Sequence, residues 1–330
     1  MSALSLSIAT WDYDRVRPLI DKRVRVEGCE LNYLPMPVEE VFHRAYFHAE
    51  FDIAEIGFSP YLIARSRDLT PYVAIPVFLS RMFRHSAIYI RTDRGIAQPA
   101  DLRGKRVGVP EYQMSAAMWA RGIVEDDYGV RPDEMRWVQG GLERPGRRDK
   151  FPLNVAADFP LEPAPPDRSL SQMLAAGEID ALFSARAPSC FERGEPHVSR
   201  LFADLRAIEQ DYFRRTGIFP IMHAVGIKRD LVERHPWLPA SVYKAFAHAK
   251  RIAEQDLHEV AALKIMLPWL ISEVQATQAV MGSDFWPYGV EANRKTLETM
   301  ARYSYSQGLA VRQLPVEDMF AAATLDQVRV

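Results

Sequence analysis

Four groups that are cationic, or can become so, lie close together in the segment SRMFRHSAIYIR, residues 80–91. They are Arg81, Arg84, His85 and Arg91, and their neighbours are apolar residues of the kind that fill a protein core. Arginine suits carboxylates because its planar guanidinium bonds both oxygens at once, and histidine exchanges protons near neutral pH. The segment is therefore either a solvated strand edge or one wall of a site for an anion.

Two further candidates for proton transfer lie elsewhere in the chain. His223 stands in the nearly apolar segment GIFPIMHAVGIK, residues 217–228. Histidines in such segments are more often hydrogen-bonded core residues than catalytic groups, so both interpretations stay open. Glu55 ranks below both His85 and His223, because a carboxylate beside an anionic ligand is costly unless it is protonated or paired.

The composition restricts the class of protein. With 330 residues the chain is long enough for two compact domains. A net charge of −2 argues against nucleic acid as a partner, and no apolar stretch approaches the ~18 residues of a membrane-spanning helix. The two isolated cysteines indicate neither a disulfide framework nor a cysteine metal site. The N-terminal segment MSALSLSIATWDYDR lacks the features of an export signal, so we expect a cytoplasmic protein.

Strand-like and helix-like segments alternate along the first ninety residues and again from residue 101, which predicts an α/β protein with largely parallel sheets. After residue 228 the pattern is mostly helical. The segment 139–168 interrupts the second series, since it holds six prolines and three glycines and shows no regular periodicity. Irregular loops of this length are usually functional or disordered, so we interpret it as a lid over a site, with a mobile insertion as the alternative.

Five segments together resemble the 4,5-dihydroxyphthalate decarboxylase family: SRMFRHSAIYIR, WVQGGLERPGR, LAAGEIDALFSARAP, TGIFPIMHAVGIKRDL and GSDFWPYG. The resemblance covers essentially the whole chain. It implies the two-lobed α/β fold of type II periplasmic binding proteins, in which the hinge is crossed twice and the ligand lies between the lobes. Residues 1–92 and 219–330 would form lobe one, with extra C-terminal helices, and residues 93–218 would form lobe two, with the lid 139–168.

The resemblance also implies an activity, the conversion of 4,5-dihydroxyphthalate to protocatechuate and carbon dioxide. Each carboxylate of that dicarboxylate is para to a hydroxyl, so the ring itself can accept the electrons and no organic cofactor is needed. The reaction requires a base at the phenol, an acid near the ring carbon, and cations for the two carboxylates. We expect neither a cofactor nor a metal, because the histidines are scattered and show no ligand spacing.

Sites in such folds lie between the lobes and at the carboxyl ends of parallel strands. On this basis we expect His85, His223 and Glu55 to be catalytic. Arginines are expected at the carboxylates, aromatic side chains around the ring, and hydrogen-bond donors near a helix start. The expected substrate-binding residues are Trp11, Ser59, Arg81, Arg84, Gln113, Ser115, Arg186, Phe219, Trp286 and Tyr288. For Trp286 and Tyr288, anchoring of the C-terminal helices is the alternative.

A second function is compatible with the same fold, that of a solute-binding protein for an aromatic-acid transporter. The absence of a recognisable export signal favours the cytoplasmic enzyme. The resemblance further implies a homo-oligomer, although the apolar faces of the C-terminal helices fit packing within one chain equally well.

Overall fold

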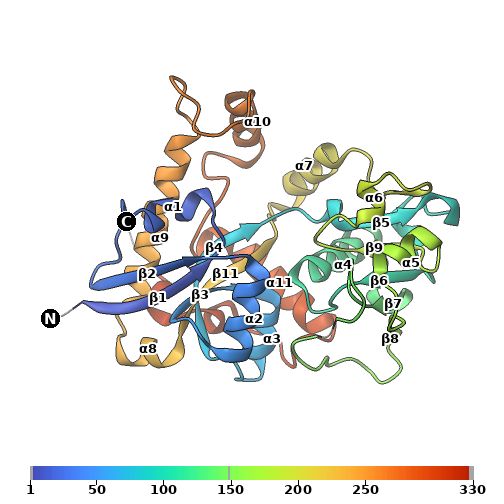
Figure 1. Ribbon diagram of the computed structural model, residues 1–330, viewed down its shortest axis with the longest axis horizontal. Helices are drawn as coiled ribbons and strands as arrows, with labels where there is room; N and C mark the ends of the chain where they lie inside the picture. The colour runs from blue at the N-terminus through green and yellow to red at the C-terminus, as the bar shows by residue number, and fades with distance from the viewer. Residues whose placement is uncertain (1–2, 148, 327–330) are drawn as a thin grey trace.

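The computed structural model describes residues 3–147 and 149–326, which form two sheets covered by helices (Figure 1). The first sheet has the order β2-β1-β3-β11-β4. Its strands are β1 (Leu4–Thr10), β2 (Cys29–Pro35), β3 (Ile53–Gly57), β4 (Tyr72–Arg81) and β11 (Ile221–Lys228). Strand β11 runs antiparallel to both β3 and β4, whereas β1, β2 and β3 are parallel. The carboxyl ends of β1, β3 and β4 therefore share one edge with the amino end of β11.

The second sheet has the order β10-β5-β9-β6-β7-β8. Its strands are β5 (Ile88–Arg91), β6 (Arg106–Val109), β7 (Arg136–Gln139), β8 (Leu161–Pro163), β9 (Ala181–Phe183) and β10 (Val198–Arg200). Strands β6, β7, β8 and β9 are parallel, so their carboxyl ends also meet at one edge. We call each sheet with the helices packed on it a lobe, and the chain crosses between the lobes twice, before β5 and before β11.

Two details of the predicted organisation are wrong. We expected lobe one to extend to residue 92, whereas β5 pairs with β9 and β10 and belongs to lobe two. The apolar pattern of residues 86–91 predicts a strand, but its partners lie about a hundred residues away and leave no local signal. The segment 139–168 is not wholly irregular either, because it contains β8, which pairs with β7.

Helices cover both sheets and connect their strands. They are α1 (Arg17–Ile20), α2 (Val38–His48), α3 (Phe58–Ser66), α4 (Ser115–Tyr128), α5 (Leu170–Ala176), α6 (Ser189–Glu192), α7 (Leu205–Thr216), α8 (Arg229–Arg234), α9 (Leu238–Asp256), α10 (Leu270–Met281) and α11 (Arg294–Ser306). Helix α3 follows β3 directly, and Gly57 is its N-cap. Helix α4 ends at Gly129, whose φ of 67° suits the left-handed conformation that closes many helices. The short loops before α3 and α4 place both helix starts close to the carboxyl edges of the sheets.

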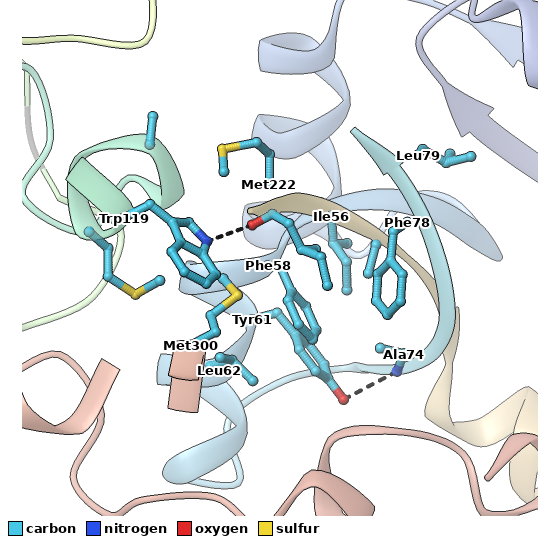
Figure 2. Packing of buried hydrophobic residues seen from close by; sticks show 14 of the residues in the cluster. Ile56, Phe58, Tyr61, Leu62, Ala74, Phe78, Leu79, Trp119, Met222 and Met300 are labelled. Carbon is cyan, nitrogen blue, oxygen red and sulfur yellow. Dashed lines mark hydrogen bonds between the residues drawn. The ribbon is translucent and has the colours of Figure 1, made fainter. Parts of the chain in front are cut away.

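A continuous apolar core joins the lobes (Figure 2). Trp119 of α4 is fully buried, and its indole N–H donates a hydrogen bond to the carbonyl of Ile221 at 2.9 Å. On the other side of this junction, the hydroxyl of Tyr61 accepts a bond from the N–H of Ala74 at 3.2 Å and donates to the carbonyl of Met319 at 2.7 Å. The start of β11 is therefore held in a fixed position between the lobes.

Helix α11 makes a further contact between the C-terminal part of the chain and lobe two. Arg302 forms an ion pair with Asp126 of α4 at 2.5 Å, and the hydroxyl of Tyr303 donates to the same carboxylate. The ring of Tyr303 packs against Gly122, where an added Cβ would lie only 2.2 Å from it. Glycine at this position thus permits the close approach of the two helices.

None of the helices within residues 3–147 and 149–326 has both the length and the apolar character required to cross a membrane.

Candidate active site

Strands β3 and β11 bring Glu55 and His223 together at the edge between the lobes. In the antiparallel register His223 lies opposite Gly57. The imidazole Nδ1 of His223 is 2.7 Å from Oε1 of Glu55. The carboxylate is fully buried, while the histidine keeps part of its surface open. Two adjacent strands therefore fix an acid–base pair whose histidine faces a space between the lobes.

The segment that follows β1 supplies two more hydrogen bonds to Glu55. The backbone N–H of Trp11 donates to Oε2 at 2.9 Å, and the hydroxyl of Tyr13 donates to Oε1 at 2.7 Å. Burial, together with the Glu55 carboxylate, raises the pKa of Tyr13, so its hydroxyl stays a donor. Because an ionised carboxylate only accepts hydrogen bonds, we assign the hydrogen to Nδ1 of His223, and Nε2 is then directed away from Glu55.

A cavity of about 240 Å³ opens beside this pair, and His223 is part of its wall. Side chains from both lobes line it, as expected for a site between lobes. Its other charged lining residues are Arg84, Arg147, Lys150, Arg186, Glu39 and Glu111. Four cations against two carboxylates leave a net charge of +2 when the imidazole is neutral. An adjoining cavity of about 490 Å³ shares Glu39, Arg147 and Arg186 with it. The chemistry of the cavity suits an anion that carries about two negative charges.

Arg84 is the most deeply buried cation of this wall, with 7% of its surface exposed. Its Nε donates to the sulfur of Met222 at 3.0 Å, and Nη1 lies 3.6 Å from the sulfur of Met82. Burial lowers the pKa of Arg84 to about 10, which still leaves the guanidinium charged at neutral pH. The structure thus holds a charged arginine in the wall of the cavity with thioether partners.

The loop between β7 and β8 contributes two more cations. Nε of Arg147 lies 2.5 Å from one oxygen of Glu111, and Nζ of Lys150 lies 2.7 Å from the other. Burial by itself would raise the pKa of Glu111, but the cations Lys150 and Arg147 outweigh it and hold the pKa below its usual value. Glu39 adds weaker contacts, at 4.0 Å to Arg147 and 3.6 Å to Arg186. The loop cations are therefore balanced by carboxylates in this structure.

Gln113 has a different place from the one expected. Its side chain is fully buried, its Oε1 accepts from the N–H of Phe151 at 3.1 Å, and its Nε2 donates to the carbonyl of Phe151. The side-chain amide of Gln113 thus bonds both the N–H and the carbonyl of Phe151, as a neighbouring strand would. Gln113 anchors the loop that carries Arg147 and Lys150, and it is not free to bind a ligand.

The anchoring leads to a prediction about the loop. Replacing Glu111 with Gln removes the negative charge that holds Arg147 and Lys150, and each charge-assisted bond stabilises by roughly 1.5–3 kcal/mol. We expect amide hydrogen exchange in residues 142–147 to become roughly tenfold faster in the ligand-free variant, and to slow in the parent when an aromatic dicarboxylate binds. Glu134→Gln serves as the control, since Glu134 pairs with Arg103 away from this loop. Equal exchange in all three proteins would show that the loop is held by other contacts.

A second group of expected residues lies outside this cavity. Nη1 and Nη2 of Arg81 donate to the carbonyls of Pro287, at 3.1 Å, and Phe219, at 2.6 Å. The ring of Phe219 packs against Trp286, whose indole N–H donates to the carbonyl of Phe78 at 2.8 Å. Tyr288 is buried nearby, with its ring 5.5 Å from the ammonium of Lys250. This group connects β4 to the C-terminal segment, which matches the alternative that we considered for Trp286 and Tyr288.

His85 likewise lies outside the cavity. Its ring packs edge-on against Phe202 and Tyr212, with centroids 5.3 and 5.2 Å away, and 1% of the residue is exposed. Within the described part of the chain neither ring nitrogen has a hydrogen-bond partner. The turn after β4 places His85 in aromatic packing against Tyr212 of α7 and Phe202. The structure therefore gives His85 no access to a ligand in this cavity.

The burial of His85 predicts a pH effect on stability. It lowers the pKa of His85 to about 4, whereas the unfolded chain takes up the proton near pH 6.5. Stability is therefore full above about pH 6.5 and falls as the pH drops toward 4, by at most about 1.4 kcal/mol per pH unit. We expect His85→Phe to lose less Tm than the parent between about pH 7 and pH 5, and to keep parental turnover. Loss of turnover in a folded variant would return His85 to the catalytic candidates.

The remaining expected residues are divided between the cavity and its surroundings. Ser115 and Arg186 line the cavity. Ser59 is fully buried behind it, and its N–H donates to Oγ of Ser115 at 3.1 Å. Trp11 binds Glu55 through its backbone, while its side chain is 42% exposed. The structure thus brings His223, Glu55, Arg84, Ser115 and Arg186 together.

Four charged residues at the cavity were missed by the sequence analysis, namely Glu39, Glu111, Arg147 and Lys150. The basic run RPGRRDK lies within the segment interpreted as a lid, and this run was the available signal. Among the described residues, no three His, Cys, Asp or Glu side chains are grouped in a way that would hold a metal ion.

Comparison with known proteins agrees with this geometry. No family model matches the chain. It is 42% identical over 330 residues to a 4,5-dihydroxyphthalate decarboxylase of Comamonas testosteroni, covering all of both chains. It is 47% identical over 214 residues to a protein of the same name from Pseudomonas putida, covering 65% of this chain and 83% of that one.

Among solved structures, the periplasmic aliphatic sulphonate binding protein SsuA of Escherichia coli is similar, with a TM-score of 0.55, 14% identity and coverage of 98% and 99% of the two chains. This likeness confirms the periplasmic-binding-protein-like fold. The 42% identity to the Comamonas testosteroni protein extends over the full length of both chains. This chain therefore belongs to the 4,5-dihydroxyphthalate decarboxylase family.

Proposed function

We propose that the protein decarboxylates 4,5-dihydroxyphthalate to protocatechuate and carbon dioxide without oxidation. The observation that carries the proposal is the hydrogen bond of 2.7 Å between His223 and the buried Glu55, with His223 lining a cavity whose other charged side chains sum to +2. A dicarboxylate complements that charge, and a histidine supported by a buried carboxylate can hold and transfer a proton. The names of two relatives, at 42% and 47% identity, support the same substrate.

The proposed reaction uses His223 as the proton donor. The hydroxyl para to the departing carboxylate first gives its proton to water. The resulting phenolate oxygen pushes its electron pair into the ring, and the ring carbon that bears this carboxylate takes the proton from Nε2 of protonated His223. The bond from that carbon to the carboxylate then breaks, carbon dioxide leaves, and the bonding pair restores the aromatic ring and the phenolate. Water supplies the proton that recharges His223. Glu55 stabilises the imidazolium of His223 before the proton is transferred, and it holds the imidazole in one orientation throughout the reaction.

The cations of the cavity serve the negative charges of the substrate and of the phenolate. Arg147, Lys150 and Arg186 come from lobe two, whereas His223 comes from lobe one, so the ring is held only when both lobes contribute. Such positioning is a large part of catalysis, since correctly placed groups need no reorganisation during the reaction.

Turnover by purified, chelator-treated protein tests the proposal. We expect protocatechuate and carbon dioxide to appear in equal amounts from 4,5-dihydroxyphthalate, with no added metal or organic cofactor. His223→Gln protein is the matched control. Tight binding of the substrate without any product would overturn the proposal in favour of the alternative, a solute-binding protein for an aromatic acid.

We also infer a cytoplasmic homo-oligomer, as expected from the sequence. A contact with a second copy of the chain is supported by apolar side chains exposed between α9 and α10, where Val260, Met266 and Trp269 are 73%, 101% and 71% exposed. Figure 1 shows this segment projecting from the body of the protein. Light scattering gives the molar mass in solution, and a mass near that of one 37.6 kDa chain would refute the oligomer. Cell fractionation of the native host tests the location.

A further inference from the structure

Arg84 is a buried cation whose hydrogen-bond partners within residues 3–147 and 149–326 carry no negative charge. Its hydrogen-bond partners among the described residues are the sulfurs of Met222 and Met82, and thioethers are weak acceptors. Glu209 is the carboxylate that acts most on its charge, yet the two form no ion pair within 4.0 Å in the described part of the chain. Burial raises the pKa of Glu209 to about 7, so it supplies only part of a counter-charge at neutral pH. A charged group buried in this way is stabilised by a ligand that carries the opposite charge.

The start of α4 faces the same cavity. Ser115 and Ala116 line the wall beside Arg84, and the N-cap residue Met114 supplies no side-chain cap. The first N–H groups of a helix have no partner within the helix, and they attract anions. Oγ of Ser115 donates to the carbonyl of Met222 at 3.0 Å, which fixes the helix start against the strand that carries His223. A guanidinium and a helix N-terminus thus converge on one part of the cavity.

The wall next to His223 is different in character. Phe42 packs edge-on against the imidazole with ring centroids 4.8 Å apart, and Val38 and Pro60 add apolar surface to the lining. Decarboxylation moves negative charge out of the departing carboxylate and into the ring. A cation bound to that carboxylate would stabilise the substrate more than the transition state and slow the reaction. A carboxylate that stays on the ring carries no such penalty.

We propose that Arg84 and the N-terminus of α4 bind the carboxylate that remains in the product, and that the departing carboxylate lies on the apolar surface beside His223. The inference rests on the proposed function and adds to it the way in which the site distinguishes two chemically equivalent carboxylates. It makes Arg84 the residue that selects aromatic acids with a second carboxylate ortho to the one that is lost.

The product provides the test, because protocatechuate keeps one carboxylate. Arg84→Met replaces the guanidinium with an apolar side chain that suits its methionine neighbours. We expect the Kd of protocatechuate, measured by calorimetry, to rise by roughly 10²-fold, as when one partner of a buried charge pair is lost. The KM for 4,5-dihydroxyphthalate should rise by a similar factor. If KM rises while the Kd of the product stays at the parental value, Arg84 binds the departing carboxylate and the assignment is reversed.

Arg81→Met is the matched control. Arg81 is equally buried and three residues away, but its guanidinium donates to the carbonyls of Phe219 and Pro287. We expect a lower Tm and an unchanged Kd for protocatechuate. Arg84→Lys keeps the charge and should recover part of the affinity for protocatechuate. It also tests the inference if the Met variant does not fold. If protocatechuate binds Arg84→Met as tightly as the parent, the inference fails.

The experiment separates this inference from the proposed function. Product binding needs no turnover, so it reports on Arg84 even if 4,5-dihydroxyphthalate is not decarboxylated. Conversely, a parent enzyme that releases carbon dioxide, combined with an Arg84→Met variant of parental affinity, leaves the function standing and removes only the assignment of the carboxylates.

Discussion

His223→Gln lowers kcat by roughly 10²–10⁴-fold, the range typical for loss of a general acid or base, while KM stays within a few-fold of the parent. Glutamine keeps a donor for Glu55, so the hydrogen-bonded cluster of Glu55, Tyr13 and Trp11 remains intact. It cannot be protonated at neutral pH, so the ring carbon receives no proton from this position. Steady-state kinetics with product detection and a thermal melt measure the two effects.

The outcome that would remove His223 from the mechanism is a folded variant with near-parental turnover and only a lower Tm. His85→Phe is the matched control, because it replaces a histidine that the structure places away from the cavity. A loss of turnover in His85→Phe alone would exchange the roles of the two histidines.

Glu55→Gln is expected to reduce kcat by about 10²–10³-fold. The amide keeps the size of the carboxylate, but it no longer stabilises an imidazolium, and its NH₂ group can face Nδ1 and force the wrong tautomer. Conversion of an orienting carboxylate to its amide lowers kcat by ~10⁴-fold in a serine protease, and here Trp11 and Tyr13 still hold the side chain in place. Rates under saturating substrate give the measurement.

Tyr13→Phe removes one of the three donors to Glu55 and leaves the charge. We expect it to lower kcat by no more than about tenfold, since Trp11 and His223 still bind the carboxylate. A loss as large as that of Glu55→Gln would mean that the tyrosine hydroxyl itself takes part in the reaction. Parental rates in Glu55→Gln would show that the pair has a structural role only.

The fold was predicted well from the sequence for two reasons. The strand and helix patterns are local, and the family resemblance implies the two-lobed arrangement. Alternating strand and helix patterns predict the α/β lobes. The pairing of β5 was missed because strand partners distant in the chain leave no pattern within the strand. Strand β8 was missed because it is only three residues long and ends in a proline, so it shows no alternating pattern.

The site was predicted only in part, because side-chain direction near a strand end cannot be read from spacing. Arg81 and Arg84 are three residues apart with similar neighbours, yet one bonds backbone carbonyls and the other lines the cavity. His85 follows Arg84 directly and points into aromatic packing. Arg147 and Lys150 lie on an irregular loop, whose path depends on its anchors at Gln113 and Glu111 rather than on any periodicity.

The contact between α11 and α4 has a mechanical consequence. If the two crossings were the only connections, the lobes could rotate apart about them. The ion pair of Arg302 with Asp126 and the packing of Tyr303 against Gly122 form a third connection between the lobes. Rotating the lobes widely apart would break this connection. We therefore propose that a ligand enters and leaves mainly by movement of the loop that carries Arg147 and Lys150, rather than by a wide separation of the lobes.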